Sequence, residues 1–228
     1  MTPRLDIYSA VHKRLRALLF DTLALVARCD ADDAFDVDRA GRQVQLMVRL
    51  CDSHLAHENA VTHPSHEARS PGVMWEAAAA HDEQLRVTAE LSALASRLDY
   101  SIGEGRREVL AVLHAKLTAF VTHSLEHMHL EETRHLPALW ATHTDDELRA
   151  MTLAIVRGTP PKELAQLRRW MLPALSHVER VAMLAGIGTS APLGVFQEVL
   201  GIARAHLSPR DFRKLVIALD DARLPTAA

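Results

Sequence analysis

Two short segments of the sequence carry the same reactive residues at the same spacing. One runs from His54 through Glu58 to Pro64, and the other runs from His127 through Glu131 to a proline at 137. In each, the glutamate follows the histidine by four residues, so on a helix both side chains share one face. Imidazole nitrogens and carboxylate oxygens bind transition metals, and a buried carboxylate has to be paired, protonated or metal-bound. The two segments therefore predict a metal site.

Two further histidines lie on the apolar faces of the other predicted long helices. They are His12 and His81. Four imidazoles and two carboxylates can hold two ions, with the carboxylates bridging them. Mixed nitrogen and oxygen ligands suit iron, manganese or zinc better than magnesium or calcium. The absence of cysteine from this set argues against a structural zinc site with thiolate ligands. The predicted metal ligands are His12, His54, Glu58, His81, His127 and Glu131.

The hydrophobic periodicity predicts long helices that place these residues. Apolar residues recur at helical spacing, and no segment alternates as a strand would, so we expect an all-α chain. Pro64 and Pro137 should each close a helix. Four helices with short connections predict an up-down-up-down four-helix bundle over residues 1–140, with the ligands toward the end that holds the N-terminus. The predicted helices span residues 5–29, 37–63, 73–98 and 106–135.

Residues 141–228 also have a helical pattern, and we expect them to form an extension that packs on the bundle. Thr144 and Glu147 have the spacing of a capping box before a first short helix. The segment around Trp170 and Leu184 is strongly apolar. It predicts a packing layer, with a homodimer surface or a signal-output segment as the alternatives.

Composition narrows the functional classes. The 228 residues carry a formal net charge of −3 without a basic stripe, so we expect no nucleic-acid partner. No run of eighteen apolar residues and no secretory signal were found, so we expect no membrane partner. Cys29 and Cys51 lack a Cys-x-x-Cys spacing and are interpreted as small buried residues, as fits a reducing cytoplasm.

The order His, His-x-x-x-Glu, His, His-x-x-x-Glu resembles the hemerythrin family of cation-binding domains over about residues 8 to 140. The resemblance implies a four-helix bundle with a non-haem di-iron centre bound by the six residues above. Members bind oxygen or nitric oxide, sense iron or oxygen, store iron, or repair iron-sulfur clusters. Oxygen carriers have two histidines one turn apart on the third helix. This chain has Ala77 before His81, which implies an open coordination position.

Several nearby residues have two interpretations. His57 and His123 are interpreted as rim residues, with a supporting role at the metal as the alternative. His63, His66, His129 and His135 are expected on the surface or in loops at the end of the bundle. Tyr8 precedes His12 by one turn, so its hydroxyl could reach the site, although a core aromatic is the simpler interpretation.

The leading functional hypothesis is a di-iron protein, with manganese or zinc as possible replacements, that binds or senses O2, NO or iron without being an enzyme. The alternative is a redox-active enzyme or repair factor that turns over peroxide or NO, or delivers iron to iron-sulfur clusters. The missing cysteine-rich domain argues against cluster repair. A third hypothesis is a helical interaction protein whose histidines bind zinc adventitiously.

Overall fold

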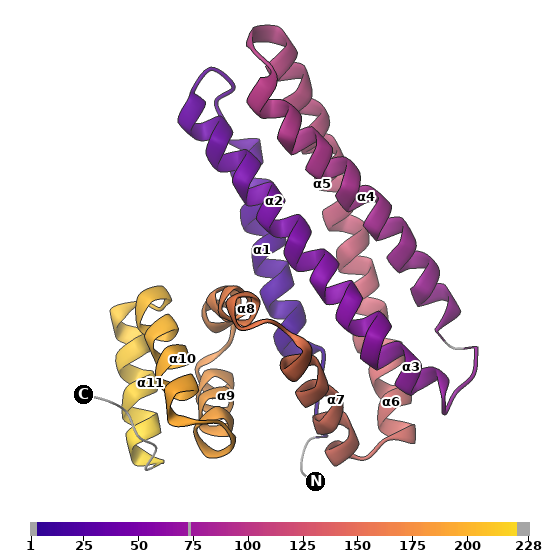
Figure 1. Cartoon of the computed structure of the whole chain (residues 1–228), viewed down its shortest axis with the longest axis vertical. Coiled ribbons are helices and arrows are strands. Elements are labelled where there is room, and N and C mark those ends of the chain that lie inside the picture. The colour runs from indigo at the N-terminus through magenta and orange to yellow at the C-terminus, as the bar shows by residue number, and fades with distance from the viewer. Residues whose placement is uncertain (1–3, 73, 223–228) are drawn as a thin grey trace. The chain divides into compact units, whose positions relative to one another are not determined.

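The computed structural model describes residues 4–72 and 74–222, and all regular secondary structure in these ranges is helical (Figure 1). The all-α prediction is therefore confirmed. The described chain divides into two compact units. The N-terminal unit contains residues 4–8 and 18–155, and the C-terminal unit contains residues 9–17 and 156–222. The first helix contributes residues to both units.

Long helices dominate the N-terminal unit, and the sequence predicted each of them to within a few residues. Helix α2 packs against α4, and α4 packs against α5. The amide of Gln43 on α2 donates to the Thr22 hydroxyl on α1 (3.1 Å). Asp33 caps α2 by accepting from the Phe35 N–H, and Gly103 begins α5 with a positive φ of 54°. The helices are α1 (Ser9–Ala27), α2 (Ala34–His57), α4 (Trp75–Tyr100) and α5 (Gly103–Leu130).

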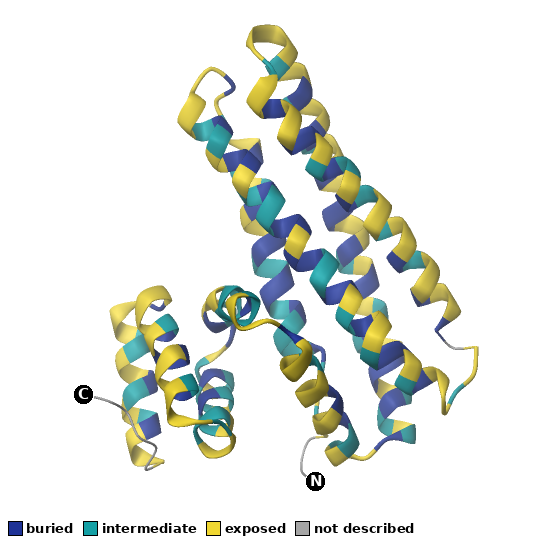
Figure 2. Cartoon of the chain, in the orientation of Figure 1, coloured by how far each residue is buried: buried dark blue, intermediate teal, exposed yellow. Residues whose placement is uncertain are grey.

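The apolar stripes predicted from the sequence line the interior of this unit (Figure 2). Leu18 on α1, Leu50 on α2 and Leu98 on α4 are each at most 1% exposed, and Leu113 and Leu117 on α5 are fully buried. Each fully buried leucine contributes about 2 kcal/mol of hydrophobic stabilisation. The stripes continue into polar residues toward one end of the unit, where the predicted ligands lie.

The two segments singled out in the sequence both contain a π-helical turn. Turn η1 (Glu58–Thr62) joins α2 to α3 (His63–Glu67), and turn η2 (Glu131–His135) joins α5 to α6 (Leu136–Thr142). In η1 the His63 N–H donates to the Glu58 carbonyl, five residues back. In η2 the Leu136 N–H donates in the same way to the Glu131 carbonyl. The π turn thus begins at the glutamate in both segments.

These turns correct the prediction that Pro64 and Pro137 end their helices. The backbone stays helical through both prolines. A proline inside an α-helix clashes with the carbonyl four residues earlier and cannot donate to it. The wider turn just before each proline shifts the hydrogen-bond register to five residues, so it relieves this conflict.

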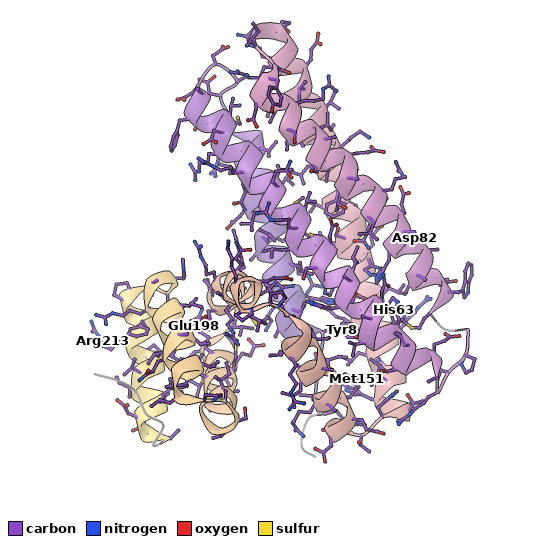
Figure 3. The ribbon with its side chains drawn as sticks, in the orientation of Figure 1. Tyr8, His63, Asp82, Met151, Glu198 and Arg213 are labelled. Atoms are coloured by element: carbon purple, nitrogen blue, oxygen red, sulfur yellow. The ribbon has the colours of Figure 1, made fainter. Side chains whose placement is uncertain are left out.

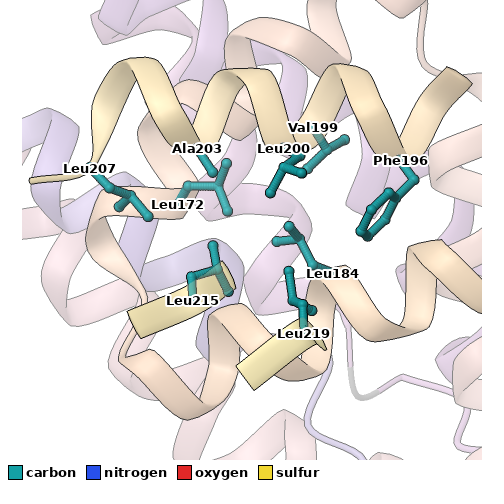
Figure 4. Close-up of a cluster of buried hydrophobic side chains, with 9 residues drawn as sticks. All are labelled: Leu172, Leu184, Phe196, Val199, Leu200, Ala203, Leu207, Leu215 and Leu219. Atoms are coloured by element: carbon teal, nitrogen blue, oxygen red, sulfur yellow. The ribbon is translucent and has the colours of Figure 1, made fainter. Parts of the chain in front are cut away.

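The C-terminal unit consists mainly of short helices around an apolar core. They are α8 (Pro161–Ala174), α9 (His177–Ser190), α10 (Leu193–His206) and α11 (Pro209–Asp221). Helix α10 packs against α8, and α11 packs against α9. The fully buried Phe196 and its aliphatic neighbours fill the space between them (Figure 4). This cluster contains Leu172, Leu184, Phe196, Val199, Leu200, Ala203, Leu207, Leu215 and Leu219.

The short helices begin at a constant interval of 16 residues. Helix α7 (Asp145–Gly158) starts at residue 145, and α8 to α11 start at 161, 177, 193 and 209. The preceding residues alternate between hydroxyl residues and prolines: Thr144, Pro160, Ser176, Pro192 and Ser208. The predicted capping box is confirmed, because Thr144 and Glu147 exchange hydrogen bonds between side chain and backbone. Ser176 and Glu179 form a second capping box.

None of the helices in the described part of the chain combines the length and apolar character needed to cross a membrane.

Candidate metal centre

Four of the predicted ligands, two histidines and two glutamates, come from the facing turns of α2 and α5. His54 and His127 lie in the last turn of their α-helices, and Glu58 and Glu131 begin the π turns that follow. His54 Nε2 is 3.3 Å from Glu58 Oε2, and His127 Nε2 is 3.4 Å from Glu131 Oε1. All four residues are buried, and Glu131 is fully so. The structure therefore places each histidine beside the glutamate four residues later.

His81 on α4 joins the two halves of this cluster. Its Nε2 lies 3.0 Å from His127 Nε2 and 3.5 Å from Glu58 Oε2. Two imidazoles that bind one ion at about 2.1 Å and near right angles hold their nitrogens about 3 Å apart, so the observed separation fits a shared ion. His81 itself is fully buried, as predicted.

The opposite ring nitrogen of His81 fixes its tautomer. His81 Nδ1 lies 2.8 Å from the amide oxygen of Asn59, which can only accept, so Nδ1 carries the proton and donates. The lone pair is then on Nε2, which faces Glu58 and His127. Metal-binding histidines commonly have a second-nitrogen hydrogen bond of this kind. Burial, followed by the neighbouring His127 and His63, lowers the pKa of His81 to about 3, so the ring is neutral at pH 7.

His63 is a member of the cluster that the sequence analysis wrongly placed at the surface. His63, labelled in Figure 3, is 7% exposed. Its ring stacks on His81 with 4.6 Å between centroids. Ligand atoms of Glu58, His63, His81 and Glu131 all lie within 4.8 Å of one another. Burial lowers the pKa of His63 to about 4, although the nearby Glu131 opposes this shift. No protein hydrogen bond reaches His63 Nε2 from the described residues.

The π turn explains why His63 lies in the cluster and why the sequence predicted it at the surface. In an α-helix, a residue five positions after Glu58 points about 140° away from it. The 58-to-63 hydrogen bond of η1 widens that turn and brings the fifth residue back toward the glutamate. The signal available in the sequence was the proline that follows each segment. It was interpreted as a helix end, when it marked a helix with an inserted residue.

Both carboxylates belong to two overlapping groups of ligand atoms. One group contains Glu58 and Glu131 with His63 and His81, and the same two glutamates also lie within 4.8 Å of a His54 nitrogen. Two buried carboxylates this close to each other repel when ionised unless cations lie between them. The donor set and its burial thus fit bound metal cations.

The remaining predicted residues have different surroundings. His12 is fully buried in the first turn of α1, within the segment 9–17, and its membership of the ligand set stays a prediction. Ala77 is fully buried and offers no ligand atom. His123 and His129 are exposed, as expected, and His57 is partly buried. His66 and His135, expected at the surface, are instead buried.

Tyr8, just before α1, lies in the electric field of both carboxylates. Burial, then Glu131 and Glu58, raises the pKa of its phenol well above the ordinary value of 10. The hydroxyl is therefore protonated at every physiological pH. Its ring packs with Leu136, Leu139 and other apolar residues, so the side chain is also the core aromatic that the sequence suggested.

Residues 4–139 match the family model of the hemerythrin HHE cation-binding domain. That range is more than half of the chain and includes every residue of the cluster described above. The chain belongs to this family. Comparisons with curated proteins and with solved structures found no match.

Proposed function

We propose that the N-terminal unit is an up-down-up-down bundle that holds two iron ions and binds or senses O2 or NO. The observation that carries the proposal is the pair of buried carboxylates, Glu58 and Glu131, shared by two groups of histidine ligand atoms. The proposed ligands within this unit are His54, Glu58, His63, His81, His127 and Glu131.

His63 changes the coordination expected from the sequence. Ala77 cannot bind metal, so the six predicted ligands are one fewer than the protein ligands of an oxygen carrier. His63 reaches the same neighbourhood from the start of α3, directly after η1, and stacks on His81. We propose that it supplies the additional imidazole, so that the centre has a nearly complete nitrogen set.

When bound, a pair of ferrous ions supplies electrons and an open position to a diatomic ligand. The chain's own residues make the surroundings of that ligand. Buried leucines and Met128 exclude water, and Asn59 holds His81 in the ligand-binding tautomer. Tyr8 keeps a phenolic proton close to the carboxylates. A hydroxyl in that position can donate a hydrogen bond to a ligand that gains negative charge.

The same phenol favours the second candidate function, a redox enzyme that turns over peroxide or NO. A protonated group beside the metal pair can transfer its proton to a reduced ligand, which then leaves. Stopped-flow mixing of the reduced protein with oxygen separates the two functions. Binding predicts a long-lived adduct that Tyr8→Phe shortens, whereas catalysis predicts rapid oxidation and turnover that Tyr8→Phe slows.

Metal content tests the centre itself. Protein purified from its own host should contain about two iron ions per chain with absorption in the near ultraviolet. Glu131→Gln should lose most of this iron, because the amide carries no charge and cannot bridge through two anionic oxygens. Glu126→Gln is the control, since Glu126 is exposed on α5, which leads directly into η2. A folded wild-type protein that takes up no iron contradicts the proposal.

A further inference from the structure

Asn59, the only asparagine in the sequence, occupies the second position of the π turn η1. The residue is exposed, whereas its hydrogen-bond partner His81 on α4 is fully buried. The amide oxygen of Asn59 accepts from Nδ1 of this ring at 2.8 Å. A polar group at the surface of the N-terminal unit thus reaches a buried imidazole of the candidate metal centre.

Two consecutive residues of η1 lie at opposite nitrogens of the His81 ring. Glu58 begins the turn, and its Oε2 is 3.5 Å from Nε2 of His81. Asn59 follows directly and binds Nδ1 of the same ring. The backbone of the turn is closed by the hydrogen bond from the His63 N–H to the Glu58 carbonyl. One short turn therefore sets the orientation of His81 from both sides before any ion binds, as a preorganised metal site requires.

The acceptor that Asn59 offers to His81 carries no net charge. In many metal centres the acceptor at this nitrogen is a carboxylate, which makes the imidazole a more basic ligand. A more basic ligand and a nearby negative charge stabilise the ferric state more than the ferrous state, because the ferric ion has the larger positive charge. An amide adds no charge and leaves the imidazole less basic. This hydrogen bond therefore orients the ring without favouring the ferric state.

The second π turn shows that the backbone at this position does not require an amide. In η2 the residue after Glu131 is Glu132, which is equivalent in sequence to Asn59. A carboxylate is thus compatible with a π turn at this point. Because Asn59 is exposed, an aspartate in its place would also stay in contact with water. Asn59→Asp should therefore fold, and it changes the charge of the acceptor while it keeps the acceptor itself.

We propose that Asn59 is a positioning residue of the metal centre, which orients His81 for metal binding and, as an uncharged acceptor, favours the ferrous state of bound iron. Asn59 acts through the imidazole ring and is not itself a ligand. The part of the inference that concerns iron rests on the function proposed above, in which the centre binds its ligand in the ferrous state. The orientation of His81 is a property of the chain alone and can be tested without iron.

Nitrogen-15 NMR of the metal-free full chain tests the orientation of His81. Long-range proton–nitrogen spectra distinguish a protonated ring nitrogen from a bare one, and His81→Gln identifies the signals of this ring. Wild type should carry the ring proton on Nδ1. Asn59→Leu removes the acceptor and should move most of the proton to Nε2, where Glu58 can accept it, and Asn59→Asp should return it to Nδ1. A wild-type ring that is protonated at Nε2 overturns the proposal.

Metal affinity and reduction potential test what this orientation does. In competition with a chelator, Asn59→Leu should bind Co²⁺ about 10- to 100-fold more weakly than wild type, and Asn59→Asp should restore the affinity. In the iron-loaded chain, Asn59→Asp should shift the midpoint potential to more negative values. Ala60→Asp is the matched control, because it places the same charge on the next exposed residue of η1, and it should shift the potential less.

These measurements separate the role of Asn59 from the function of the centre. Wild-type Co²⁺ affinity in folded Asn59→Leu, or equal shifts of the potential in Asn59→Asp and Ala60→Asp, would overturn the proposal. A chain that takes up no iron contradicts the proposed function instead. The ring signals of His81 and the Co²⁺ affinities then decide whether Asn59 positions this ring.

Discussion

The N-terminal unit and helices α8–α11 of the C-terminal unit have cores of opposite character. The N-terminal unit has long helices and a cluster of buried histidines and glutamates. Helices α8–α11 are 13 or 14 residues long, and their buried side chains are apolar except for Arg180. Arg180 donates to the carbonyls of Leu172 and Pro173 at the end of α8, so its charge is used within the fold. Among the described residues, no buried side chain of α8–α11 is a histidine or a carboxylate, whereas the N-terminal unit buries Glu58, Glu131 and the histidines around them.

This difference predicts unequal stability without metal. Hydrophobic burial stabilises α8–α11 at any pH, because the core side chains do not titrate. The buried histidines are compatible with the folded state while their rings are neutral and can bind metal. Protonation of these rings destabilises the folded state, because it places charges in the interior. The three tryptophans allow the units to be followed separately. Trp75 and Trp140 lie in the N-terminal unit, and Trp170 lies on α8.

The largest expected effect is acid destabilisation of the metal-free N-terminal unit. The pKa values of His81 and His63 are about 3 and 4 when folded, against 6.5 when unfolded. Below pH 6.5 the unfolded chain binds protons that the folded chain cannot, so stability falls until about pH 3 to 4. The total loss should be on the order of 5 kcal/mol.

Urea unfolding of the full chain at pH 7 and pH 5 measures this effect. Trp75→Phe/Trp170→Phe leaves Trp140 as the reporter, and Trp75→Phe/Trp140→Phe leaves Trp170. The Trp140 midpoint should fall strongly at pH 5, while the Trp170 midpoint should change little. Equal shifts of both midpoints would show that the two units unfold together or share the same acid sensitivity.

The second largest expected effect is the loss of stability when a cavity is made in the core of α8–α11. Phe196→Ala removes a fully buried ring from α10 and should destabilise the C-terminal unit by about 4 kcal/mol. Leu193→Ala, on the exposed side of the same helix, is the matched control and should change stability by less than about 0.5 kcal/mol. Hydrogen exchange of the full chain should show faster exchange in α8–α11. Unchanged exchange there would contradict the assignment of this core.

The smallest effect concerns an ion pair within the C-terminal unit. Lys13 Nζ lies 2.5 Å from Glu179 Oε1, and Lys13, then Ser176, holds the pKa of Glu179 down to about 2. Both side chains are about one-third exposed, so Glu179→Gln should cost only about 0.5 kcal/mol at pH 7. The ion pair contributes its full stabilisation of the folded state at pH values above 4.5, the pKa of Glu179 in the unfolded chain.

That contribution should disappear as the pH falls toward 2, so wild type and Glu179→Gln should converge there. Chemical unfolding monitored at Trp170 between pH 7 and pH 3 follows the difference. Asp221→Asn, at an exposed position at the end of α11, should match wild type throughout. A stability difference that grows toward low pH would rule out the ion pair as its source.

The sequence was sufficient to predict the long helices and the paired residues wherever the regular α-helical period applied. The spacing of His54 and Glu58, and of His127 and Glu131, placed each pair on a buried face, and the apolar stripes located the long helices. His81 was also found from its stripe. These inferences depend on local geometry, which 3.6 residues per turn describes well.

A period of 3.6 residues per turn does not describe the π-helical turns, so residues beyond them were misplaced. The π turn moved His63 onto the face of Glu58, and Pro64 hid this because a proline normally marks a helix end. His66 was assigned to the surface because it follows the predicted end of its helix at residue 63, and His135 because it is the last residue of its predicted helix. The 16-residue interval of the C-terminal helices was visible in the cap residues at 144, 160, 176, 192 and 208 but was not recognised.

The two π turns interrupt the regular hydrogen-bond register of their helices in the segments that carry the proposed metal ligands. Each contains one residue more than a regular helix would need between its glutamate and the following proline. Deleting one residue from either turn would restore a conventional register and rotate the rest of the helix by about 100°. The most regular helix that this sequence could form is therefore not the one that gathers its ligands. Selection for stability alone would remove the extra residue, and selection for metal binding would keep it.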